Sequence, residues 1–234
     1  METPRILAEQ RRSSIWFAVS LVFIIPAILI YKFLPAEAGG SHFAVCMALL
    51  GLGLISGLIA SYYGKAGYGD ELGAYLGLRR KGILLGHGDR SAILAGETEG
   101  LTVELKVYCD RSRSSELYGL SFSFSVRNPG RVCLAICDEG FFNRPVGFFP
   151  PEASRKPEWM AQRGLRLLAE PESALPGLLD KLALFSPFTL HNQHFIHLKG
   201  DTLEISMKRR TLEYGSEEIR ELLDKAAKAA GLFN

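Results

Sequence analysis

The stretch Ser13–Tyr31, SSIWFAVSLVFIIPAILIY, decides the first part of the fold, because its nineteen residues carry no charge. A second uncharged run covers Phe43–Gly64. A helix needs about 20 apolar residues to cross the hydrocarbon core of a bilayer, where its backbone polar groups must all be paired internally. We therefore predict two membrane-spanning helices, over about 13–34 and 43–64, which a short link joins into an antiparallel hairpin.

The distribution of Lys and Arg predicts the orientation of this hairpin. Three basic residues precede the first run, one lies in the link and four follow the second run: Arg5, Arg11 and Arg12, then Lys32, then Lys65, Arg79, Arg80 and Lys81. Positive charge is retained on the cytoplasmic side of a membrane. We therefore expect a bacterial inner-membrane protein with both termini in the cytoplasm. An alternative is a cleaved signal peptide, with Ala36-Glu37-Ala38 as the cleavage site. Cleavage would leave the main domain on the same side.

Small residues recur at every fourth position of the second run, at Gly53, Gly57 and Ser61. This spacing lets two helices approach each other closely. Two interpretations remain open: packing against the first helix of the same chain, and homodimerisation through the second helix.

The hairpin divides the rest of the chain into three parts. Residues 1–12 form a short cytoplasmic N-terminal segment, and residues 65–81 form a glycine-rich juxtamembrane linker or a short interfacial helix. Arg79, Arg80 and Lys81 are predicted to contact anionic lipid headgroups. Residues 82–234 form a cytoplasmic domain.

Residues 82–234 are predicted to be an α+β domain with a mostly antiparallel sheet. Leu101–Cys109 alternates apolar and polar residues as a strand does. Residues 117–137 are predicted to form a β-hairpin that turns at Asn128-Pro129-Gly130. Pro171–Leu184 is predicted to be a helix with Ser173 as its cap.

The clearest hairpin is Phe195–Lys208, with the two-residue turn Gly200-Asp201. This turn places Leu198 opposite Leu203 and keeps the apolar residues of both strands on one face. An amphipathic helix that begins at a Ser216 cap is expected to end the chain and to pack on the sheet.

The candidates for chemistry are few. His191 and His194 are weak candidates for metal ligands, because the segment leads into a strand that points neighbouring histidines in different directions. Phe141, Phe148 and Trp159 lie in an aromatic stretch, 138–163, which is a candidate ligand loop. Sequence motifs typical of nucleotide binding, serine hydrolases, zinc proteases and dithiol redox sites are absent, so we expect no catalytic residue and no cofactor.

Composition narrows the class of protein further. The 27 basic and 25 acidic residues give a formal charge of +2, so we expect no nucleic-acid partner. Four cysteines are too few for a disulfide scaffold, and reduced buried thiols are expected.

Four stretches carry a resemblance to a known group of proteins: GETEGLTVELKVY (96–108), FSVRNPG (124–130), AEPESALPGLLDKL (169–182) and HLKGDTLEISM (197–207). Together they resemble uncharacterised bacterial membrane-anchored proteins, in which a helical hairpin precedes a cytoplasmic α+β domain. The resemblance implies a fold and transfers no catalytic residue. The chain also resembles bacterial pleckstrin-homology-like membrane proteins, although the helix predicted at 171–184 departs from their pattern.

These observations predict a membrane protein whose cytoplasmic domain is a non-enzymatic interaction or assembly module with a protein partner. The alternative is a membrane-tethered domain that binds a small ligand or a lipid headgroup. A hydrolase or metalloenzyme without a known motif is the third interpretation.

Overall fold

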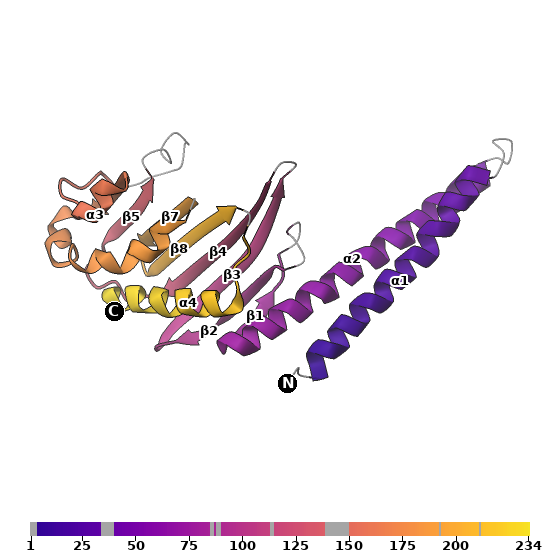
Figure 1. The fold of residues 1–234 in the computed structure, drawn as a ribbon, viewed down its shortest axis with the longest axis horizontal. Helices are drawn as coiled ribbons and strands as arrows, with labels where there is room; N and C mark the ends of the chain where they lie inside the picture. The colour runs from indigo at the N-terminus through magenta and orange to yellow at the C-terminus, as the bar shows by residue number, and fades with distance from the viewer. Residues whose placement is uncertain are drawn as a thin grey trace. The chain divides into compact units, whose positions relative to one another are not determined.

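A computed structural model describes residues 4–33, 40–84, 87, 90–112, 115–138, 150–191, 193–210 and 212–234 (Figure 1). The chain divides into two compact units, Met1–Glu71 and Leu72–Asn234.

The first unit consists of two long helices, α1 (Pro4–Phe33) and most of α2 (Gly40–Leu76). They are antiparallel, since Ser20 of α1 contacts Gly53 of α2 whereas Ala27 contacts Cys46. Both are long and apolar enough to cross a membrane, judged by length and composition over Ser14–Lys32 and Phe43–Leu76.

Gly53 and Gly57 lie where α2 packs against α1 of the same chain. A Cβ atom at Gly53 would come within 2.5 Å of Ile24 Cγ1, and one at Gly57 would lie 3.6 Å from Ser20 Oγ. Ser20 Oγ donates a hydrogen bond of 2.9 Å to the Gly53 carbonyl oxygen. The face that holds these two glycines is therefore occupied within the hairpin, and Ser61 lies exposed beyond it.

Helix α2 continues through most of the segment that we predicted as a linker, 65–81, and ends at Leu76. Ala66, Gly67 and Gly69 are buried, so compact side chains are used here for close packing, which outweighs their weak helix propensity. Gly77 ends the helix with a φ of +72°, a conformation that glycine adopts without steric cost.

The second unit is built on an eight-stranded sheet in which every pair is antiparallel. Its order is β1-β2-β3-β4-β8-β7-β5-β6. The strands are β1 (Arg79–Gly82), β2 (Ala92–Thr98), β3 (Leu101–Ser112), β4 (Ser115–Ser125), β5 (Cys133–Asp138), β6 (Leu165–Glu170), β7 (Gln193–Lys199) and β8 (Thr202–Arg210). The remaining elements are helices α3 (Glu158–Gln162) and α4 (Ser216–Ala230) and 3₁₀ helices η3 (Glu172–Gly177), η4 (Lys181–Leu190) and η5 (Gly231–Phe233).

The predicted α+β class is confirmed, and so is the β7–β8 hairpin with its register. Leu198 pairs with Leu203 and Ile196 with Ile205, as a two-residue turn at Gly200-Asp201 requires. The C-terminal helix is confirmed as well, although Gly215 occupies the N-cap position and the helix has no side-chain cap.

The predicted hairpin over 117–137 is wrong. Strand β4 pairs with β3 and β8, and β5 pairs with β6 and β7, so the β7–β8 hairpin separates the two strands that we expected to be neighbours. The connection between β4 and β5 instead passes the β7–β8 turn, where Val126 N donates to the Asp201 oxygen at 2.9 Å.

Asn128 holds this connection in place. Its buried side chain donates from Nδ2 to the carbonyl oxygens of Val132 (2.9 Å) and Gly200 (2.7 Å). Its Oδ1 accepts from Val132 N at 3.1 Å, and its backbone has a φ of +42°. Its backbone N–H donates to the Phe233 oxygen, which attaches the C-terminus to the same point.

The predicted helix over 171–184 is also wrong, because the chain forms η3 and η4 there. Pro176 and Pro187 each lack the N–H that an α-helix would use, so the segment settles into shorter 3₁₀ turns. Ser173 therefore lies inside η3 and does not act as a cap.

Helix α4 and η4 cover one face of the sheet (Figure 1). The covered face carries the apolar residue of each alternating pair, and α4 contributes a stripe at helical spacing. The buried residues include Leu105, Leu120, Phe122, Phe124, Ile196, Ile205, Phe185, Ile219, Leu222, Leu223 and Ala226.

We predict that Asn128→Ala lowers the free energy of unfolding by about 2–4 kcal/mol, because three buried hydrogen bonds are lost and alanine is strained at positive φ. Urea unfolding of the full-length protein in detergent micelles measures this change. Arg127→Ala is the control, since that side chain is exposed and the hydrogen bond of this residue comes from its backbone N–H, which alanine keeps. Equal unfolding midpoints for the two variants would contradict the role of Asn128.

Candidate functional site

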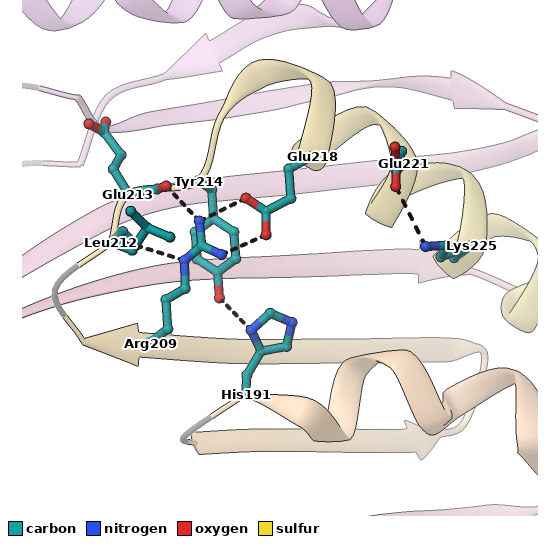
Figure 2. A network of polar contacts seen from close by, with 8 residues as sticks. All are labelled: His191, Arg209, Leu212, Glu213, Tyr214, Glu218, Glu221 and Lys225. Atoms are coloured by element: carbon teal, nitrogen blue, oxygen red, sulfur yellow. Dashed lines mark hydrogen bonds and ion pairs between the residues drawn. The ribbon is translucent and has the colours of Figure 1, made fainter.

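A polar network fixes the connection between β8 and α4 (Figure 2). Arg209, at the end of β8, forms a bidentate ion pair with Glu218 of α4, with nitrogen–oxygen distances of 2.6 and 2.7 Å. Its Nε donates to the Leu212 oxygen at 2.7 Å and its Nη2 to the Glu213 oxygen at 2.5 Å. The Arg209 side chain is only 14% exposed, so this pairing takes place largely out of water.

The ring of Tyr214 stacks on the guanidinium group of Arg209. The Arg209 Cζ lies 3.9 Å from the centroid of its ring, and its hydroxyl lies 3.2 Å from His191 Nδ1. Burial raises the pKa of Tyr214 well above its ordinary value, so the phenol keeps its proton. Burial, and then the charge of Arg209, lower the pKa of His191, which favours a neutral ring that accepts at Nδ1.

The chemistry of this network is structural. Four donated hydrogen bonds use most of the five N–H groups of Arg209, and a bidentate carboxylate neutralises its charge. The arrangement therefore presents neither an anion site nor an activated base. It ties together three segments that lie apart in the sequence: the end of η4, the end of β8 and the first turn of α4.

Two exposed leucines adjoin the network. Leu190, directly before His191, is 71% exposed, and Leu212, two residues before Tyr214, is 64% exposed. In the described part of the second unit, the other large apolar side chains of this kind, Tyr75 and Leu184, are each 40% exposed. We call Leu190 and Leu212 the leucine pair.

The two histidines singled out in the sequence have different surroundings. His191 contacts Tyr214, whereas His194 is buried on β7 with its Nε2 atom 3.6 Å from Asp138 Oδ1. Within the described ranges, no group of three or more His, Cys, Asp and Glu side chains is placed to hold a metal ion.

The predicted aromatic ligand loop lies mostly outside the described residues, which include neither Phe141 nor Phe148. Trp159 lies on α3, and the Arg163 Cζ is 5.6 Å from its ring centroid. Its Nε1 is buried and has no hydrogen-bond partner in the part of the chain that is described.

The basic triplet Arg79, Arg80 and Lys81 forms most of β1 at an edge of the sheet. Lys81 Nζ lies 2.5 Å from Glu104 Oε2, and this contact holds the pKa of the Glu104 carboxyl below its ordinary value. Contact of the triplet with lipid headgroups stays a prediction.

The face of the sheet opposite α4 carries a second polar cluster at β3 and β8. Asp110 lies between His87 Nδ1 at 2.8 Å and Lys208 Nζ at 2.9 Å. The ring of Tyr108 lies over Gly119 on the neighbouring strand, where a Cβ atom would collide with it. These opposite charges neutralise one another, so the cluster has the character of the solvated face of an antiparallel sheet.

Sequence reasoning missed Arg209, Tyr214 and Glu218. Arg209 has the same parity as Ile205 and Met207, which lie on the covered face, so an arginine at this position signals a buried charge that needs a partner. That signal identifies neither the partner nor the tyrosine between them.

No known protein-family model matches this chain, and no curated protein matches it. Among solved structures, the crystal structure of the mycobacterial trehalose monomycolate transport factor A, TtfA, is similar, with 9% sequence identity and a TM-score of 0.42. The similarity covers 71% of this chain and 92% of that chain. At this level it carries no conclusion about function.

We predict that Arg209→Ala lowers the free energy of unfolding by about 3 kcal/mol, because it leaves the Glu218 carboxylate and two carbonyl oxygens without their donor. Lys225→Ala is the matched control, because Lys225 also forms an ion pair with a glutamate of α4. Its exposed ion pair with Glu221, at 3.7 Å, is worth less than about 0.5 kcal/mol. Urea unfolding of both variants compares the two pairs, and similar losses would contradict a special role for Arg209.

Proposed function

We propose that this protein is a membrane-anchored, non-enzymatic binding module that docks a protein partner through the leucine pair. One observation carries this proposal: two highly exposed leucines adjoin residues that the Arg209 network ties together. Contiguous exposed apolar patches mark interaction surfaces, and we take Leu190 and Leu212 as parts of one such patch.

The hydrogen bonds and the ion pair beside the leucine pair bear on affinity. A docking side chain that is already ordered loses little conformational entropy on binding, so more of the contact energy appears as affinity. The charges around the leucine pair are already engaged, since Arg90 pairs with Glu213 at 2.7 Å and Arg209 pairs with Glu218. The surface therefore favours a partner that buries apolar side chains over one that supplies a strong charge.

The first unit supports the membrane anchor of this proposal. Helices α1 and α2 expose many large apolar side chains, including Phe17, Val22, Phe43, Leu54 and Leu58, that water would solvate poorly. The distribution of basic residues supports a bacterial inner membrane with both termini in the cytoplasm. Arg79, Arg80 and Lys81 then follow α2 at the cytoplasmic surface, where anionic lipid attracts them.

We predict that the double variant Leu190→Ser/Leu212→Ser recovers about tenfold less of the crosslinked partner than the unchanged protein does, equivalent to about 1.4 kcal/mol of binding free energy. The measurement is crosslinking in native membranes, followed by affinity purification of the full-length chain and quantitative mass spectrometry.

Leu184→Ser is the matched control, because Leu184 is an exposed leucine of η4 that precedes the leucine pair. A control that loses as much partner as the double variant, or equal recovery from all three proteins, would refute docking through this surface. Residues 1–81 alone should recover no partner of the second unit.

The topology gives a separate prediction. A reporter enzyme that folds only in the cytoplasm, fused after Asn234, should be active, and a reporter that needs the outer side should be inactive in the same place. The opposite pattern would reverse the orientation and would leave the leucine pair on the outer side of the membrane.

A further inference from the structure

An apolar groove of about 230 Å³ runs between α1 and α2. It is lined by Ala27, Ile28 and Tyr31 from α1 and by Phe43, Met47 and Leu50 from α2, with Cys46 beside them. An apolar cavity of about 150 Å³ in a protein core accommodates benzene, so this groove has room for a longer stretch of hydrocarbon.

The floor of the groove is made of small residues and its rim of large ones. Ala27 and Cys46 are buried, and the Cys46 thiol lies 3.8 Å from the Ala27 oxygen, so the two helices are close at the floor. Ile28, Phe43 and Met47 form an exposed rim. A narrow, flexible chain fits this shape, whereas the backbone of another helix is held away by the rim.

The side chain of Lys32 places a positive charge near one end of the groove. Lys32 is exposed and follows Ile28 by one helical turn, so both lie on the same face of α1. An apolar groove that ends at a lysine is complementary to a phospholipid, whose acyl chains are uncharged and whose phosphate is negative.

We propose that the groove binds one acyl chain of a phospholipid and that Lys32 pairs with the phosphate of the same lipid. This inference rests on the membrane anchoring proposed above. Water is a poor occupant, because it needs two to four polar partners and the lining offers apolar surface.

The test uses the full-length protein in vesicles of equal parts phosphatidylethanolamine and phosphatidylglycerol. The probe is a phosphatidylglycerol with a photoreactive diazirine in one acyl chain, and mass spectrometry locates the labelled residues. We expect about fivefold more label on Met47 and Leu50 than on Leu58, although Leu58 is the most exposed of the three, which corresponds to about 1 kcal/mol of preference.

Two variants separate the parts of the site. Cys46→Leu fills the floor and should reduce the label on Met47 to the level of Leu58, whereas Leu58→Phe, an equally apolar change away from the groove, should leave it unchanged. Lys32→Gln should reduce labelling by the phospholipid probe and leave labelling by a diacylglycerol with the same diazirine unchanged. Because Lys32 is exposed at a helix end, this variant tests the proposal even if Cys46→Leu does not insert.

Label in proportion to exposed surface would overturn the proposal, and so would crosslinks through Met47 between two copies of the chain. If alkaline carbonate extracts the protein from membranes, the membrane anchor itself fails. If the protein stays in the membrane and the label is uniform, only the lipid site fails.

Discussion

The buried side chain of Asn128 is the contact on which the order of the sheet depends. It bonds to the backbone of its own connection and to the β7–β8 turn at Gly200, so it holds a hairpin from late in the sequence between two strands from its middle. The C-terminus attaches at the same residue through the Phe233 oxygen. The sheet, its inserted hairpin and the end of the chain are therefore coupled at one point.

Arg209 bonds the end of β8 to α4, as Asn128 bonds the β4–β5 connection to the β7–β8 turn. A charged group at a largely buried strand end must be neutralised, and Glu218 on the first turn of α4 supplies the carboxylate. Neutralising that charge also fixes the turn between them and the stacked ring of Tyr214. The exposure of Leu190 and Leu212 follows from this order, because both leucines adjoin residues that the network holds.

The hairpin of α1 and α2 uses small residues in two different ways. At Gly53 the absence of a side chain brings α1 and α2 into contact, whereas at Ala27 and Cys46 small side chains leave a groove under a rim of larger ones. Close packing at one level and space at another come from the same rule, namely that the side-chain volume at the contact sets how much of the gap between two helices is filled.

Local patterns in the sequence were enough to predict several elements of the fold. Two uncharged runs identified α1 and α2, the Gly200-Asp201 turn determined the β7–β8 register, and the apolar spacing after Ser216 identified α4. Which strands are neighbours depends on long-range contacts, because a turn signal such as Asn128-Pro129-Gly130 describes the local chain direction and carries no information on what is inserted beside it. The same holds for Arg209, Glu218 and the leucine pair, since their meeting depends on contacts between segments that local patterns leave independent.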